Sequence, residues 1–149
     1  MPAMELESVG QQHNPSLLYA IKQVELGIRS HLDALLRPYG ITAPQYTALT
    51  VLQHSARLSA ADLARHSFVT AQTMGEMVDT LQRLDLITRR ADPNHKRRML
   101  ISLTDGGHRL LAECSKVVAE LEATMVSGLN PRQRQTLRSY LDNCRASLH

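Results

Sequence analysis

A twelve-residue segment near the middle of the chain, residues 87–98, concentrates positive charge. It holds five lysine or arginine side chains and a single carboxylate, Asp92, whereas the whole chain of 149 residues has a net charge of only +3. The basic charge therefore belongs to one local feature. Cations gathered at one place bind phosphate groups, and such a patch is typical of proteins that contact nucleic acid. The alternative is a solvated surface loop, because charged runs often do no more than face water.

A tight turn divides this basic segment. Residues 92–95 read Asp-Pro-Asn-His, with Asp and Pro at the positions that type I turns prefer. The flanking residues predict strands over 86–90 and 99–103, with Ile101 and Leu103 on one face. The sequence therefore predicts a β-hairpin whose two shoulders carry the positive charge.

Helical periodicity predicts four helices before the hairpin. The first spans about 16–37, and the second begins at Thr42, an N-cap that forms a capping box with Gln45. Ser59 caps a short third helix and Thr70 caps a fourth; two short helices with a brief connection predict a helix-turn-helix. The fourth helix is expected to bury Met74, Met77, Val78, Leu81 and Leu84, and to expose Gln72, Thr73, Glu76, Asp79, Thr80 and Arg83.

Two more helices are predicted after the hairpin. Thr104 caps the fifth, which is expected to end at Gly128, and Asn130 with Pro131 begins the sixth. A helix-turn-helix followed by a β-hairpin is a winged helix. The predicted fold class is therefore mainly α, a winged helix-turn-helix in the order α-α-α-α-β-wing-β-α-α, with N- and C-terminal helices forming a dimerisation region.

The terminal helices carry more apolar surface than a compact winged helix can cover. Long helices with continuous apolar stripes commonly pack across a two-fold axis, so a homodimer is expected through residues 15–37 and 104–149. A monomer in which these helices form their own bundle remains the alternative. Within one structural domain, the chain is expected to divide into a flexible N-terminal arm, a dimerisation helix, a winged helix-turn-helix region and C-terminal dimerisation helices, at 1–14, 15–41, 42–103 and 104–149.

Composition narrows the class of protein. No stretch approaches the roughly 18 apolar residues of a membrane span, and residues 1–14 lack the basic start and apolar run of a secretory signal. Two cysteines cannot form a disulfide framework. A cytoplasmic, nucleoid-associated protein is expected. Glycine-rich phosphate loops, nucleophile elbows and paired metal motifs are not found in the sequence, so neither an enzyme nor a cofactor is expected.

Two segments of the chain resemble a known family. GITAPQYTALTVL (residues 40–52) opens the second helix, and RRADPNHKRRMLISLTDGG (residues 89–107) spans the wing. With the order of elements, they resemble the MarR (multiple antibiotic resistance regulator) type of bacterial transcription factor over about residues 15–148. The positions that fit are Thr42, Pro44, Gln45, Leu49, Leu52, Asp92, Pro93, Arg97, Leu103, Thr104 and Gly107. The resemblance implies a homodimer on a pseudo-palindromic duplex, with the fourth helix in the major groove and a wing arginine in the minor groove.

Two positions depart from the family pattern. The usual wing motif is Asp-x-Arg, in which the acid orients the arginine, but here it reads His95-Lys96-Arg97. His95 can make one hydrogen bond but offers no fixed carboxylate. The recognition helix commonly ends at Gly, whereas this chain has Asp85, which tolerates left-handed geometry better than most residues.

The resemblance and the chemistry of the side chains together assign roles on DNA. Arg97 is expected in the minor groove, where narrow A·T-rich stretches attract a guanidinium. Gln72 and Thr73 are expected to reach base edges, because the first turn of a recognition helix enters the groove deepest. Glu76 either accepts a hydrogen bond from a cytosine amine or faces solvent. Phosphate contacts are expected from Lys96, Arg98, Arg89 and Arg90.

Two helix caps are candidate phosphate ligands as well. Thr70 is expected to cap its helix and, as a second role, to contact a phosphate. Ser59 is expected to donate to phosphate from the start of the third helix.

A small amphipathic ligand, often an aromatic acid in this family, is expected to release the protein from DNA. It would bind where the dimer helices meet the winged helix, with His31, Leu35, Tyr39 and Tyr46 as candidate lining residues. An ordinary core explains Leu35 and Tyr46 equally well.

Other switches and another function remain open. Cys114 and Cys144 lie on apolar stripes and are expected to be buried structural thiols, although a redox switch is the alternative. The seven histidines are scattered, so no metal is expected; the alternative is a site assembled between helices, for example from His31 and His108. The rival function is a winged helix that binds an acidic protein partner, which salt and sequence dependence would distinguish from DNA binding. A repressor is expected, because that is the commoner outcome in the family.

Overall fold

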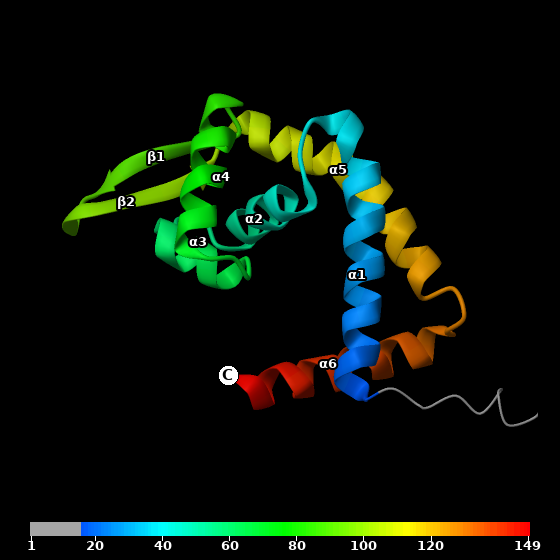
Figure 1. The fold of residues 1–149 in the computed structure, drawn as a ribbon. Helices are drawn as coiled ribbons and strands as arrows, with labels where there is room; N and C mark the ends of the chain where they lie inside the picture. Colours follow the sequence, from blue (N-terminus) through cyan, green and yellow to red (C-terminus); the bar gives the residue numbers. More distant parts are fainter. Residues whose placement is uncertain (1–15) are drawn as a thin grey trace, which may run out of the picture.

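The computed structural model describes residues 16–149. Six α-helices and a two-stranded antiparallel sheet follow in the expected order, which confirms the predicted fold class (Figure 1). The expected arm, residues 1–14, lies outside the described residues. The elements are α1 (Leu17–Leu36), the short 3-10 helix η2 (Arg37–Tyr39), α2 (Ala43–His54), α3 (Ala60–His66), α4 (Ala71–Arg83), β1 (Ile87–Asp92), β2 (His95–Leu103), α5 (Asp105–Met125) and α6 (Pro131–Leu148).

Local capping sets where the helices begin. Thr42, Ser59, Thr70, Thr104 and Asn130 each accept a hydrogen bond from the backbone N–H three residues further along, as predicted. The capping boxes of α2 and α6 are complete, since the third helical residue bonds back to the cap in both. These interactions are short-range, so the sequence determines them before any tertiary contact forms.

The core lies between α2, α3, α4, α5 and the base of the hairpin. Leu49, Leu63, Met74 and Ile101 are almost fully buried in it. Leu84 was expected to be buried, and this prediction was wrong, because Leu84 is 48% exposed. Helix α4 ends at Arg83, so Leu84 is the C-cap and its side chain leaves the apolar stripe.

The turn after α4 supplies another core residue in its place. Asp85 adopts φ 59°, the left-handed conformation expected at this position. The chain reverses there, and the N–H of Leu86 donates to the carbonyl of Leu81. Leu86 is consequently buried.

The hairpin is longer than the sequence indicated. Its strands run to Asp92 and from His95, rather than stopping at residue 90 and starting at residue 99. Side chains near the tip are exposed on both faces, so no apolar alternation reveals that backbone pairing continues. Figure 1 shows the hairpin projecting away from the helices. At its base, the backbone of Ile101 pairs with that of Leu58, which joins β2 to the α2–α3 connection.

Gly107 allows α5 to pack closely against the end of the helix-turn-helix. A Cβ at this position would lie 2.3 Å from the carbonyl oxygen of Leu86, so only glycine fits. Thr104 completes the junction, because its hydroxyl donates to the carbonyl of Asp85 at 2.6 Å. The close approach of the two backbones explains why glycine occupies position 107, near the start of α5.

Helices α1, α5 and α6 lie apart from the winged helix over much of their length (Figure 1). Helix α5 ends at Met125, before the expected Gly128. No described residue of α6 is buried, and Cys144 on it is exposed, whereas Cys114 on α5 is buried. The expectation of a buried thiol is thus correct for Cys114 and wrong for Cys144 within a single chain. Among residues 16–149, none of the helices combines the length and the hydropathy that a membrane span requires.

Candidate nucleic-acid interface

The outer face of α4 presents short polar side chains. Gln72, Thr73 and Glu76 are all exposed, while the opposite face of α4 is buried. Thr70 accepts a hydrogen bond from the N–H of Thr73 at 3.1 Å and donates to the Thr73 hydroxyl at 3.0 Å. The first turn of α4 is therefore held by its cap, and Gln72 in this turn and Glu76 in the next face solvent.

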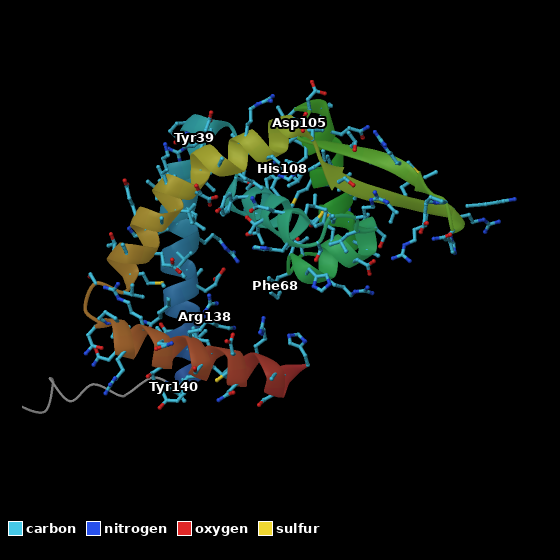
Figure 2. All side chains as sticks on the ribbon, turned by 180° about the vertical axis from the view of Figure 1, so that it is seen from behind. Tyr39, Phe68, Asp105, His108, Arg138 and Tyr140 are labelled. Carbon is cyan, nitrogen blue, oxygen red and sulfur yellow. The ribbon has the colours of Figure 1, made fainter. Side chains whose placement is uncertain are left out.

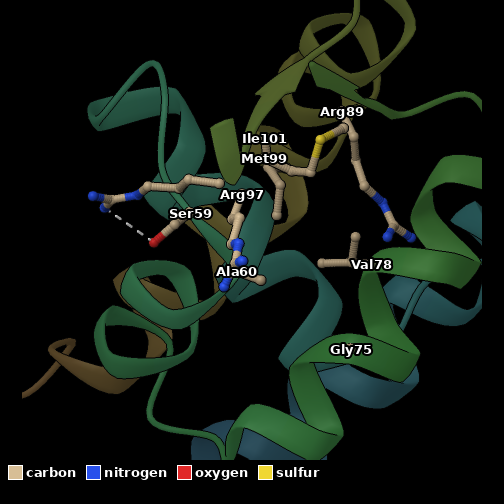
Figure 3. Close-up of a pocket in the computed structure, with 9 residues that line it drawn as sticks. Ser59, Ala60, Gly75, Val78, Arg89, Arg97, Met99 and Ile101 are labelled. Carbon is tan, nitrogen blue, oxygen red and sulfur yellow. Dashed lines mark hydrogen bonds between the residues drawn. The ribbon is translucent and has the colours of Figure 1, made fainter. Parts of the chain in front are cut away.

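The wing and the helix-turn-helix enclose a shallow cavity of about 340 Å³. Its lining includes Ala60 of α3, Gly75 of α4, and Arg97 and Met99 of β2. Figure 3 shows the Arg97 side chain extending toward Ala60 at the first turn of α3. Gly75 lies between the exposed positions of α4, so the wing cation and the polar face of α4 share one side of the molecule.

Arg98 is committed to a contact with α3. Its Nη2 lies 2.5 Å from Oδ2 of Asp62 and 3.3 Å from Oγ of Ser59. The Ser59 hydroxyl donates to the same Asp62 oxygen at 2.9 Å and accepts from the Asp62 N–H at 3.2 Å. Arg65, one turn later in α3, pairs with the other oxygen of Asp62. Ser59, expected to donate to phosphate, is buried and already donates its proton within the protein.

These contacts favour the ionised form of Asp62. The hydrogen bond from Ser59 lowers the pKa of the carboxyl most, burial opposes this, and the charges of Arg65 and Arg98 lower the pKa further. The carboxylate is therefore charged at neutral pH and available as a fixed anion beside the wing.

Arg89 on the other strand is also engaged. It forms an ion pair with Asp79 of α4, and its side chain is 31% exposed against 66% for Asp79. Its Nε is buried without a hydrogen-bond partner among the described residues. Both strands of the wing are thus tied by an arginine to a helix of the helix-turn-helix.

The remaining cations of the basic segment face solvent. Arg90, His95, Lys96 and Arg97 are exposed. Sequence reasoning named the arginines but missed their carboxylate partners, Asp62 and Asp79. The Ser-x-x-Asp spacing at Ser59 was a usable local signal, because it is the pattern of a helix cap with an acid in the first turn.

The four candidate ligand residues do not line the cavity that α1 and α2 form. A cavity of about 190 Å³ lies between α1, α2 and the α3–α4 connection, and neither His31, Leu35, Tyr39 nor Tyr46 lines it. His31 is exposed and its Nδ1 lies 2.8 Å from the Gly27 carbonyl oxygen. Tyr39 and Tyr46 are partly buried against the core.

The residues that do line this second cavity combine apolar and charged groups. They include Ile28, Arg29 and Leu32 of α1 together with Ser67 and Val69. Ser67 is buried, and its hydroxyl has no hydrogen-bond partner in residues 16–149. Across those same residues, no group of three or more His, Cys, Asp or Glu side chains is placed to hold a metal ion.

A helix-turn-helix with an exposed polar recognition helix and a basic wing defines a winged-helix DNA-binding protein. Residues 39–98 match the sequence model of the MarR family. The chain is 31% identical over 131 residues to the HTH-type transcriptional repressor Rv2887 of Mycobacterium tuberculosis, covering 87% of this chain and 94% of that protein. The protein belongs to the MarR family of transcriptional regulators.

Solved structures agree with this assignment. A mutant of MarR from Escherichia coli complexed with operator DNA superposes with a TM-score of 0.76 at 26% identity, covering 86% of this chain and 92% of that one. The MarR family protein Rv2887 of M. tuberculosis, in complex with salicylic acid, gives a TM-score of 0.73 at 29% identity and covers 88% and 97%.

Proposed function

We propose that this protein is a homodimeric transcriptional repressor that binds a pseudo-palindromic operator and is released by a small aromatic acid. The observation that carries the proposal is the shared placement of Gly75 on α4 and Arg97 on the wing around one open cavity. A recognition helix and an exposed wing cation on one side can engage adjacent grooves of a single duplex. Such a protein acts on DNA without catalysis, in the cytoplasm at the nucleoid.

Apolar surface on the terminal helices supports the dimer. Leu17, Leu18 and Val24 of α1 are 83%, 73% and 52% exposed, and Leu148 of α6 is 79% exposed. Exposed apolar patches of this kind mark surfaces at which a protein associates with a partner. Figure 2 shows Arg138 and Tyr140 projecting from different sides of α6, and Tyr140 is also largely exposed. A second copy packed on α1, α5 and α6 would cover this surface.

The exposed side chains divide into two groups by role. Gln72, Thr73 and Glu76 are proposed to meet base edges in the major groove, and Arg97 the minor groove. Lys96 and Arg90 are proposed to meet phosphates, with Thr70 near the backbone at the start of α4. Arg89 and Arg98 already neutralise carboxylates, so their contribution to phosphate binding is smaller than that of the free cations.

The cavity between α1, α2 and the α3–α4 connection is the proposed effector site. Its size suits a single aromatic ring, and Leu32 and Val69 supply apolar walls. In the structure, Nη2 of Arg29 lies 2.6 Å from Oε1 of Glu25. When the ligand binds, its carboxylate would replace Glu25 as the partner of the Arg29 guanidinium. Salicylate should therefore weaken operator binding, and an Arg29→Gln variant should need a higher salicylate concentration for the same release.

Fluorescence anisotropy tests the DNA-binding proposal. The protein is titrated against duplexes from its own upstream intergenic region and against a scrambled duplex, at two salt concentrations. Binding about a thousandfold tighter than to the scramble, with a steep salt dependence, is expected. Weak and equal binding to every upstream duplex would contradict this proposal and favour a protein partner for the wing.

A further inference from the structure

The wing is anchored to the body of the protein at a small number of points along β2. The backbone of Ile101 pairs with Leu58 through two hydrogen bonds, of 2.7 and 3.3 Å. Three residues further toward the tip, Arg98 binds Asp62 and Ser59. Beyond Arg98, the side chains of His95, Lys96 and Arg97 are exposed. Arg98 is therefore the outermost side chain of β2 with an ion pair to the helices in the described part of the chain.

The carboxylate at this anchor is well placed to act on the wing. The Asp62 side chain is only 20% exposed. It accepts a hydrogen bond from Ser59 and forms ion pairs with Arg65 and Arg98. A carboxylate with three partners has little freedom to move. Arg97 lines the same cavity as Ser59. Because Arg97 directly precedes Arg98 in the chain, the contact that holds Arg98 also limits where the Arg97 backbone can lie. Ser59 accepts a hydrogen bond from Arg98, which the dashed line in Figure 3 marks beside the labelled Arg97 side chain.

We propose that Asp62 is a positioning residue for DNA recognition: through Arg98 it fixes the wing against α3, so that Arg97 is held ready for the minor groove. In the family pattern, an acid within the wing orients the arginine. We propose that a carboxylate of α3, Asp62, does so here through Arg98. The DNA part of this inference rests on the proposed function; the anchoring of the wing does not.

The sign of one substitution separates positioning from simple electrostatics. Asp62→Asn removes a negative charge from the DNA-facing side and releases Arg98, so electrostatic attraction alone would tighten DNA binding and steepen its salt dependence. Loss of positioning would weaken specific binding instead. We expect operator affinity to fall by up to about fivefold, the upper end for a partly exposed ion pair, while affinity for the scrambled duplex stays equal or rises. Asp105→Asn, a charge removal at the start of α5, is the matched control and should leave the specificity ratio unchanged.

Two combinations of variants show whether Asp62 acts through Arg98 and Arg97. The exchanged pair Asp62→Arg with Arg98→Asp should recover most of the affinity lost by each single change. Arg97→Ala should cost less in the Asp62→Asn background than in the wild type, because a misplaced arginine has less contact to lose. Additive effects, or tighter operator binding by Asp62→Asn, would overturn the proposal.

Hydrogen exchange of the free protein separates this inference from the proposed function. Amides of residues 90–98 should exchange severalfold faster in Asp62→Asn, while amides of α4 keep their protection. Unchanged exchange in the hairpin would refute the anchor. Faster exchange in a protein that binds no duplex specifically would uphold the anchor and refute only the operator proposal.

Discussion

Replacement of Arg97 by alanine separates DNA contact from protein stability. Arg97 is exposed, whereas Arg89 and Arg98 form ion pairs with helices. Arg97→Ala should therefore leave the thermal unfolding temperature nearly unchanged, because substitutions at exposed sites usually alter stability by less than about 0.5 kcal/mol. Any loss of operator affinity then reports the contact with DNA.

The magnitude follows from the symmetry of the complex. One specific arginine contact is worth about 1–3 kcal/mol, and a homodimer presents two wings to one operator. The pair of substitutions should cost at least about 2 kcal/mol, or roughly thirtyfold in dissociation constant. A nonspecific duplex should lose far less, since only charge is removed there.

Anisotropy titration of wild type and Arg97→Ala against operator and scrambled duplexes measures both losses, with circular dichroism melting as the check on folding. The loss should be larger when the sequence under the wing is A·T-rich, because a narrow minor groove attracts arginine more strongly. Equal losses on both duplexes would refute the minor-groove assignment and make Arg97 one more phosphate ligand. Unchanged affinity would remove it from the interface.

Three further predictions concern charge, packing and pH. Lys96→Ala should lower the slope of log affinity against log salt concentration by about one for each subunit, without changing sequence preference; an altered preference would contradict a pure phosphate role. Gly107→Ala should destabilise the fold by more than about 1 kcal/mol, because its Cβ would lie 2.3 Å from the Leu86 carbonyl oxygen, whereas Gly75→Ala has open space and should not destabilise it in the same urea titration. The pKa of Asp62 is lowered from 3.8 in the folded state, so its contribution to stability is present above that pH and is lost as pH falls through the folded-state value. The unfolding free energies of wild type and Asp62→Asn should draw closer as pH falls below 3.8, and a difference that stays constant from pH 6 downward would contradict the assignment.

Features that depend on neighbouring residues could be predicted from the sequence. Thr42, Ser59 and Thr70 cap their helices through hydrogen bonds that span three residues, so residue type and spacing suffice to place them. The left-handed conformation of Asp85 was expected from the resemblance to the MarR family, in which this position is commonly Gly. Leu84 was wrongly assigned to the buried face of α4, because it continues the helical period one position past the end of the helix. The period itself does not reveal where the turn begins.

Features that depend on long-range geometry could not be predicted. Arg98 and Asp62 are 36 residues apart, and their contact depends on how the hairpin packs against α3. The sequence therefore placed Arg98 with the phosphate-binding cations, whereas the structure shows its charge already paired. The candidate ligand residues on α1, η2 and α2 were chosen by their chemistry, but the orientation of each helix about its axis decides which side chains line a cavity.

We expect two copies of this chain to read a two-fold symmetric DNA sequence. Selection of bound duplexes from a random pool, followed by sequencing, tests this directly and needs no knowledge of the natural operator. The enriched sequences should form a pseudo-palindrome whose half-site centres are about 10 base pairs apart, with A·T-rich flanks under the wings. Bound duplexes without a shared motif, or with a single asymmetric site, would contradict the account.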